Sequence, residues 1–380
     1  MNLTTDISEL RALIALGELP TVGNRRAKDL VHHFGSAEQA MTASESDWKA
    51  VPNMHADHVT AILAAKPAAL SRADKEVEFM EKHRVQAFYY EEDDYPQRLS
   101  ECFDCPLLLF GKGNLKPNDG KFVSIVGTRM PTDRGKQLCR DLVNDLAQKV
   151  PDVTIVSGLA YGIDVTAHKA AIEAGLPTLI IPGHGLDRIY PAVHRGVAVA
   201  ALNNGGILTE FISGTEPIGP NFVARNRIIA GLADAVVVVE SRDKGGSLIT
   251  ADIAFTYSRD LFAFPGRPGD KNAAGCNRLI KYDQAHLIDS ADDLIAAMRW
   301  QPKNAQDGSY QTTLDLLYAD LAPEEQVLMD ILHQNEDGVH VNSLVFESKM
   351  PYAATSSLLF QMEMRGLVNS LPGGVYKALK

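Results

Sequence analysis

The chain has 380 residues, of which 45% are hydrophobic and 22% are charged, and its formal net charge at pH 7 is −11. This length predicts two or three ordinary globular domains. No run of about 18 apolar residues occurs, the first ten residues lack the basic and apolar regions of a signal peptide, and four cysteines do not make a disulfide framework. We therefore expect a soluble protein of the cytoplasm with no membrane partner.

The charge is unevenly distributed along the chain. Residues 120–290 carry 18 Lys and Arg against 17 Asp and Glu, whereas residues 1–119 and 291–380 each have a net charge of −6. A uniformly acidic protein would repel nucleic acid. The nearly neutral middle leaves room for a local basic groove.

Residues 1–83 predict a small helical domain of the SAM or helix-hairpin-helix kind. Segments 19–35 and 51–62 both resemble helix-hairpin-helix units, whose hairpin amides can meet a DNA phosphate. The first segment keeps Gly23, but the second has Asn53 where a glycine is expected. We interpret both as structural, with DNA contact as the alternative.

Residues 84–298 predict a Rossmann-like α/β domain with a lead-in segment, which contains a strand near 85–90 and a polar linker at 111–120. The rest alternates apolar strands with helices, which is typical of a doubly wound, mostly parallel sheet. The expected strands are 122–126, 153–156, 178–182, 206–209, 235–239, 260–264 and 286–288. The expected helices are 132–149, 163–175, 191–204, 222–232 and 247–257. The loops after these strands should gather at one sheet edge, where such sheets bind ligands.

The turn after strand 122–126 contains Gly127 and Arg129. Gly127 allows close backbone approach, and Arg129 offers a planar charged fork that suits phosphate. The alternative is a plain strand-to-helix turn with a solvated arginine. The full G-x-G-x-x-G dinucleotide pattern is missing, which disfavours a dinucleotide and favours a more extended ligand.

The helix near 220–232 carries Arg225, Asn226 and Arg227 in its first turns. Cations near a helix N-terminus oppose the helix dipole, and a bound anion would resolve the conflict. The alternative is that Asp or Glu on a neighbouring loop pairs with the arginines. Phe222 could expose its ring for base stacking, as in single-strand binders, or serve as a buried anchor.

Several phosphate-suited groups in a row favour a nucleic-acid strand over a mononucleotide. The candidate binding residues are Gly127, Arg129, Ser157, Gly158, Asn221, Phe222, Arg225, Asn226, Arg227, Gly246 and Ser247.

The sequence patterns for catalysis and for metal binding are weaker than the pattern for nucleic-acid binding. His168 or His184 could form an acid–base pair with Asp164, Asp187 or Glu210, although the four-residue spacing of Asp164 and His168 predicts a local helix pair. Cys102 and Cys105 lack the second ligand pair that a zinc site needs. We expect no catalytic residue, no metal and no cofactor.

Residues 299–321 predict a polar linker, and residues 322–380 a winged-helix-like domain of three helices and a glycine-tipped hairpin. This domain carries 4 Lys and Arg against 7 Asp and Glu, and its third helix has Arg365 as its one basic residue. We expect it to contact protein or to have lost a DNA-binding role.

Four ordered segments resemble the DNA-processing protein A family (DprA/Smf). They are 124–129 (SIVGTR), 157–164 (SGLAYGID), 222–232 (FVARNRIIAGL) and 246–250 (GSLIT). The resemblance implies a non-enzymatic, homodimeric protein that binds single-stranded DNA, protects incoming DNA, and helps load RecA recombinase in natural transformation (competence) and recombination.

Carried over by position, the resemblance implies that Arg129, and Arg225 and Arg227 or their helix amides, hold phosphates. Phe222 would contact a base, and the amides of Ser157, Gly158, Gly246 and Ser247 would line the groove. Members often have a basic residue shortly before this phenylalanine, where this chain has Pro220 and Asn221, and often a proline after it, where this chain has Val223.

An enzyme of the lysine-decarboxylase-like type, which cleaves nucleoside monophosphates on a related core, is the alternative. Such enzymes resemble P-G-G-x-G-T-x-x-E, with a catalytic glutamate. Here residues 245–252 (GGSLITAD) lack the proline and offer Asp252 as the nearest carboxylate. We therefore expect a binding protein.

Overall fold

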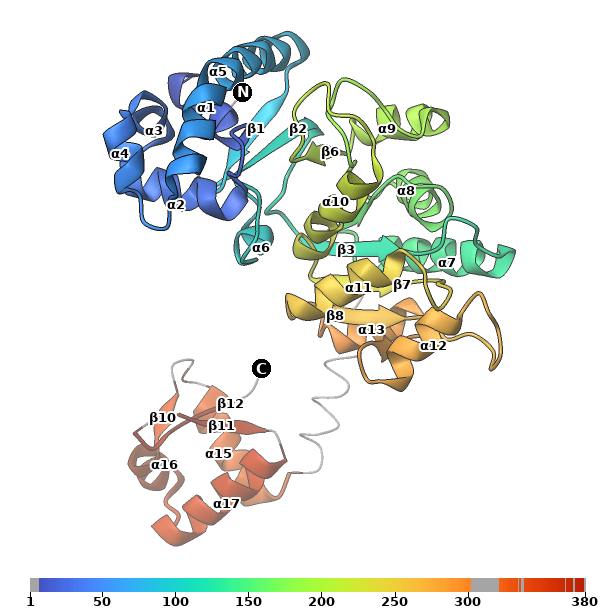
Figure 1. Ribbon diagram of the computed structural model, residues 1–380. Coiled ribbons are helices and arrows are strands. Elements are labelled where there is room, and N and C mark those ends of the chain that lie inside the picture. The colour runs from blue at the N-terminus through green and yellow to red at the C-terminus, as the bar shows by residue number, and fades with distance from the viewer. Residues whose placement is uncertain are drawn as a thin grey trace. The chain divides into compact units, whose positions relative to one another are not determined.

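The computed structural model describes residues 7–301 and 321–378, apart from 334, 336, 337, 366 and 372. The chain divides into two compact units, residues 1–303 and 304–380 (Figure 1). The predicted linker 299–321 lies mostly outside the described residues. The predicted boundary between residues 83 and 84 falls inside the first unit and stays a prediction.

The first unit begins with five helices that pack around their own core. They are α1 (Ile7–Gly17), α2 (Asn24–Phe34), α3 (Ala37–Thr42), α4 (Glu45–Ala50) and α5 (Ala56–His83). Leu13, Leu30, Trp48 and Ile62 are fully buried there, and the cluster continues into the first strands of the sheet through Phe110. This shared core ties the helical region to the sheet.

The sheet has nine strands in the order β1-β2-β6-β5-β4-β3-β7-β8-β9. The strands are β1 (Gln86–Tyr89), β2 (Leu108–Asn114), β3 (Lys121–Val126), β4 (Val153–Ser157), β5 (Thr178–Ile180), β6 (Gly205–Thr209), β7 (Ala235–Val238), β8 (Asp260–Ala263) and β9 (His286–Leu287). Strands β3 to β9 pair in parallel, while β1 and β2 add an antiparallel edge. The predicted mostly parallel α/β fold is confirmed.

Helices cover both faces of this sheet because successive strand residues face opposite sides. Val236 and Val238 of β7 share a core with α10 (Gly219–Gly231), α11 (Ser247–Thr256) and α12 (Ala274–Lys281). Ala235 and Val237 pack on the other face with α7 (Asp133–Lys149), α8 (Ile163–Glu173) and α13 (Ala291–Ala297). The remaining crossover contains η1 (Ala192–His194) and α9 (Arg195–Ala201), and α6 (Gln97–Ser100) precedes β2.

The strand order reverses direction at β3 and β7. From β3 the chain proceeds outward through β4, β5 and β6, and then returns to place β7 on the other side of β3. Loops that leave neighbouring strands at such a switch point diverge and open a crevice at the carboxyl edge of the sheet.

The linker predicted at 111–120 begins later than expected. Residues 111–114 belong to β2, where Gly111 pairs with Leu208 and Gly113 with Gly206. A Cβ atom on Gly113 would come within 2.6 Å of the Gly205 carbonyl oxygen. The glycines of this segment therefore allow close strand pairing, whereas the composition of the segment had predicted a linker.

The second unit has the helix and strand order of a winged helix. Its elements are α15 (Pro323–His333), β10 (Val339–His340), α16 (Val341–Ser348), α17 (Tyr352–Met364), β11 (Val368–Leu371) and β12 (Val375–Ala378). Arg365 lies 3.0 Å from the buried Glu325 carboxylate. The basic residue of the predicted third helix is thus engaged inside the unit. In the described ranges of both units, no helix combines the length and apolarity needed to cross a membrane.

Candidate nucleic-acid interface

A groove of about 550 Å³ opens at the switch point between β3 and β7. Its lining comes from residues 126–129 at the end of β3, from Ala160 and Asp164 after β4, from α10 between Gly219 and Ile229, and from residues 242–250, which run from the loop after β7 into α11. Seven of the eleven predicted binding residues line it: Gly127, Arg129, Phe222, Arg225, Asn226, Gly246 and Ser247. The other four, Ser157, Gly158, Asn221 and Arg227, do not line it.

Gly127 makes the turn after β3 compact. A Cβ atom there would overlap Ile163 at the start of α8 and lie 3.1 Å from the Glu240 carbonyl oxygen. The Thr128 amide donates to that same oxygen over 2.8 Å. The Glu240 carboxylate in turn accepts from the amide and hydroxyl of Thr132, which caps α7. The ends of β3 and β7 are thereby held together beneath the groove.

Arg129 and Phe222 meet in the groove. Arg129 is exposed, and its guanidinium carbon lies 6.0 Å from the centroid of the Phe222 ring, which is at the limit of a cation–π contact. Phe222 is half-buried, and a Cβ atom on Gly183 would lie 2.9 Å from its ring. Phe222 is therefore partly anchored and partly open to solvent.

Arg225 is buried, with 4% of its surface exposed, and its guanidinium donates to the Ile181 carbonyl oxygen. It lies directly over Gly158, where any Cβ atom would overlap it. Burial lowers the pKa of Arg225 to about 10, which leaves it charged at neutral pH, and the buried Asp164 carboxylate favours that charge. Burial raises the pKa of Asp164, and Arg225 opposes that rise.

Arg227 points away from the groove. Its guanidinium pairs with Glu210 and donates to the Asp104 carbonyl oxygen, and both paired side chains are more than four-fifths buried. It lines a separate cavity of about 660 Å³ together with Arg25 and Arg26 of the N-terminal helices. Both arginines of α10 thus have an acidic neighbour within the protein.

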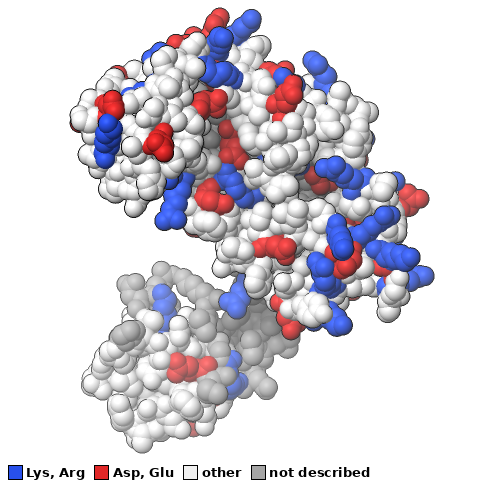
Figure 2. Space-filling model, viewed as in Figure 1, with Lys and Arg blue, Asp and Glu red and all other residues white. Residues whose placement is uncertain are grey.

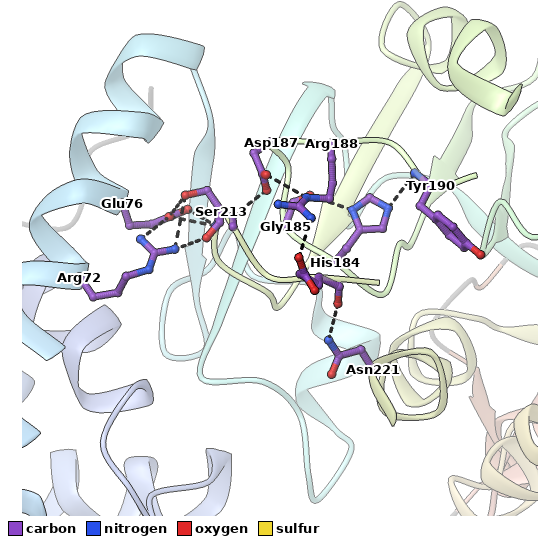
Figure 3. Close-up of polar contacts among 11 residues, drawn as sticks. Arg72, Glu76, His184, Gly185, Asp187, Arg188, Tyr190, Ser213 and Asn221 are labelled. Carbon is purple, nitrogen blue, oxygen red and sulfur yellow. Dashed lines mark hydrogen bonds and ion pairs between the residues drawn. The ribbon is translucent and has the colours of Figure 1, made fainter. Parts of the chain in front are cut away.

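The remaining predicted residues are held by hydrogen bonds. The Ser157 hydroxyl is buried and donates to the Ile125 carbonyl oxygen over 2.6 Å. The Asn221 amide group donates to the Glu216 carbonyl oxygen over 3.0 Å (Figure 3). Ser247 is buried and donates to the Ser241 hydroxyl over 2.9 Å. Gly246 is exposed at the start of α11.

The groove is basic. Arg129, Arg242 and Lys244 are exposed and line it, and Asp164 is the one carboxylate among its described lining residues. Figure 2 shows many Lys and Arg side chains over the region where α7 and α12 lie, with Asp and Glu among them, and the N-terminal helices also display both signs. Arg242 and Lys244 are absent from the predicted binding residues, although two cations in the loop that follows a predicted strand were a usable signal.

The candidate acid–base pairs that the sequence left open do not form in the described part of the chain. His168 Nδ1 lies 2.7 Å from the Thr178 hydroxyl, and the Ala160 amide donates to Asp164 over 3.4 Å. The expected local pair of Asp164 and His168 is therefore wrong. His184 contacts backbone atoms through both ring nitrogens, and Asp187 accepts from the Gly214 amide. Asp252, on which the enzymatic alternative depends, does not line the groove.

Family models match most of the chain. Residues 86–299 match the model described as DNA recombination-mediator protein A, and residues 315–374 match the DprA winged helix domain. The DNA processing protein DprA of Streptococcus pneumoniae is 39% identical over 57% of this chain and 75% of its own length. Protein Smf of Synechocystis is 31% identical over 97% of this chain and 99% of its own length.

Two solved structures resemble the fold. The X-ray structure of DprA from Streptococcus pneumoniae superposes with a TM-score of 0.65 at 32% identity, over 77% of this chain and 98% of that chain. The DprA structure from Helicobacter pylori, described as giving insight into a single-stranded DNA-binding mode, has a TM-score of 0.51 at 30% identity. It covers 57% of this chain and 95% of that chain.

Proposed function

The chain belongs to the DNA-processing protein A (DprA/Smf) family, and from this premise we propose that it binds single-stranded DNA in the groove between β3 and β7. The bound strand would be protected there and passed on by helping to load RecA recombinase. DNA taken up in natural transformation is the proposed source of that strand. The relative from Helicobacter pylori, whose description concerns single-stranded DNA binding, supports the choice of ligand.

The contact between Arg129 and Phe222 is the observation that carries this proposal. Single-strand binders combine cations that neutralise the backbone with aromatic rings on which bases stack. Here an exposed guanidinium and a partly exposed ring lie 6.0 Å apart at the carboxyl edge of the sheet. Arg242 and Lys244 extend the positive charge along the same groove.

We propose two kinds of role for the predicted residues. Arg129 holds a phosphate, Phe222 contacts a base, and the backbone at Gly127, Gly246 and Ser247 allows the strand to approach, with Asn226 beside it. Arg225, which lies over Gly158, supplies a fixed positive charge at the base of the groove, and the buried Ser157 holds the end of β4 beside Gly158. Asn221 and Arg227 hold α10 in place through Glu216 and Glu210.

We also propose that the protein acts in the cytoplasm as a homodimer and without catalytic turnover. The acid–base pairs that would have favoured an enzyme are replaced by structural hydrogen bonds at His168 and His184. Incubation with a panel of nucleoside monophosphates tests this point. Release of free base would favour the lysine-decarboxylase-like alternative.

Removal of either groove side chain should weaken binding of single strands. For Phe222→Ala we expect a loss of about 1–3 kcal/mol, the usual contribution of one stacked base. For Arg129→Ala we expect weaker binding and a salt dependence that is less steep by about 0.7 in log–log slope, because one phosphate contact is lost. Fluorescence anisotropy of the full chain with labelled single- and double-stranded oligonucleotides measures both effects.

Lys75→Ala is the matched control, since Lys75 is an exposed cation on α5 outside the groove. It should bind as the unsubstituted protein does. Unchanged affinity in both Arg129→Ala and Phe222→Ala would refute the proposed groove.

A further inference from the structure

We propose, on the basis of the proposed function above, that Tyr190 forms a second base-stacking site beside Phe222 for a nucleobase of the bound strand. Tyr190 follows β5 in the loop that leads to η1, and it is absent from the predicted binding residues. Its ring centroid lies 5.7 Å from that of Phe222, at an interplanar angle of 34°.

The two rings are too close to hold a base between them. Stacked bases are about 3.4 Å apart, so a sandwiched base would require ring centres about 6.8 Å apart. Each ring can therefore offer only a face that is turned to solvent. Tyr190 is 47% exposed, whereas Phe222 is half-buried between Gly183 and its neighbours. Of the two rings, Tyr190 has more surface available to a base.

Nothing in the described part of the fold uses the polar end of this side chain. The Tyr190 hydroxyl makes no hydrogen bond to a described residue, and the ring points away from His184 (Figure 3). A half-exposed aromatic ring beside a basic groove is suited to sequence-tolerant stacking, because every base has a π-face.

The loop fixes the position of Tyr190 before any ligand arrives. The Tyr190 amide donates to His184 Nε2 over 3.2 Å, and His184 Nδ1 donates to the Gly185 carbonyl oxygen over 2.8 Å. Thr209 donates its hydroxyl proton to the His184 carbonyl oxygen over 3.1 Å. These contacts belong to the backbone and to buried His184, so a substitution of the tyrosine ring leaves them in place. A preorganised ring loses little conformational freedom on binding.

Asp187, in the same loop as Tyr190, connects this loop to residues 213–215. Asp187 accepts from the Gly214 amide over 2.7 Å and pairs with Arg188 over 3.0 Å (Figure 3). The loop that carries Tyr190 is thus joined to the segment that leads into α10 and Phe222. This hydrogen bond links the two segments from which the two rings come.

Anisotropy titrations of the full-length Tyr190→Ala and Tyr190→Phe variants with a labelled oligo-dT test the inference. We expect Tyr190→Ala to lower affinity about five- to 150-fold, the range for one aromatic–base stack. Tyr190→Phe should stay within about twofold, because the hydroxyl is not used. The slope of log affinity against log salt should not change, since no phosphate contact is removed. Tyr282→Ala is the matched control, because Tyr282 is 64% exposed directly after α12 and has no ring contact with Phe222.

A set of oligonucleotides with one abasic site at successive positions separates stacking from positioning. In the unsubstituted protein, one abasic position should cost affinity through Tyr190, and that cost should disappear in Tyr190→Ala. The stacking role would be overturned if Tyr190→Ala lost the same affinity, relative to the unsubstituted protein, on every oligonucleotide of the set, with or without the abasic site. Unchanged binding by Tyr190→Ala with weaker binding by Phe222→Ala would overturn this inference alone. No single-strand binding by the unsubstituted protein would overturn the proposed function as well.

Discussion

Arg225 and Arg227 stand two positions apart in α10, yet they point to different parts of the molecule. Arg225 lies over Gly158 near Asp164, whereas Arg227 pairs with Glu210. Residues two apart on a helix do not share a face. A pair of cations near a helix N-terminus therefore need not mark one anion site, and here each has its own acidic neighbour.

Substitution of Arg225 should act on stability before it acts on DNA. Arg225→Ala removes the positive charge that favours the ionised form of the buried Asp164, and it leaves the Ile181 carbonyl oxygen without its donor. We expect a loss of about 1–3 kcal/mol in free energy of unfolding, the usual cost of a buried polar group without its partner. Urea unfolding followed by circular dichroism measures this, and Arg129→Ala is the control because Arg129 is exposed. Arg225→Ala combined with Asp164→Asn should lose less, since no buried charge is left unpaired. A stable Arg225→Ala variant with a reduced salt slope would instead mark Arg225 as a direct phosphate ligand.

The sequence could identify the polar strand ends, but it could not tell which side chains stay exposed. Gly127 and Arg129 were predictable because a buried strand runs directly into them. The burial of Arg225 depends on Gly158 and Ile181, which lie more than 40 residues away in the chain and contribute only space and a carbonyl oxygen. Neither contribution leaves a local pattern in the sequence.

At the level of elements, α5 holds the segment that leads into α10. Glu76 is only 1% exposed, and its carboxylate accepts from the Ser213 amide over 2.9 and 3.0 Å. Arg72 pairs with Glu76 over 3.3 Å and donates to the Ser213 carbonyl oxygen (Figure 3). The N-terminal helices thereby help to set the position at which α10, and with it Phe222, begins.

We therefore predict that Glu76→Ala weakens single-strand binding several-fold without a change in salt slope. The Ser213 amide loses its acceptor, which also costs about 1–3 kcal/mol of stability. Anisotropy titrations measure the affinity. In the same variant, backbone hydrogen exchange at residues 211–216 should become faster. Glu76→Gln keeps one acceptor oxygen, so its affinity and its exchange rate should lie between those of the unsubstituted protein and those of Glu76→Ala. Faster exchange with unchanged affinity would show that α5 does not position the groove.

The elements themselves were largely predictable, because all seven strands expected between 122 and 288 are present and the apolar pattern alternates as expected. The order of the strands was not. That β3 lies between β4 and β7 depends on long-range pairing such as Val123 with Ala235. The sequence could mark Arg242 and Lys244 as cations in the loop after a strand, but only this order brings that loop to the side of Arg129.

At the level of the whole molecule, the net charge of −11 and the basic groove have opposite consequences for DNA binding. Charges farther from the strand than about 8–10 Å are screened at physiological salt, so the nearby cations decide the salt dependence. Arg129, Arg242 and Lys244 are the exposed cations of the groove, and none has an ion-pair partner among the described residues.

Three phosphate contacts predict a slope of log affinity against log salt of about −2 for a single strand, since each contact contributes about −0.7. Anisotropy titrations across a salt series measure this slope. Arg129→Ala should reduce its magnitude by about 0.7, and Lys75→Ala should leave it unchanged. A slope of about −4 or steeper would require cations outside the groove. Arg25 and Arg26, which line the cavity beside Arg227, would then be the first to replace, because they would bring the N-terminal hairpins into the DNA path.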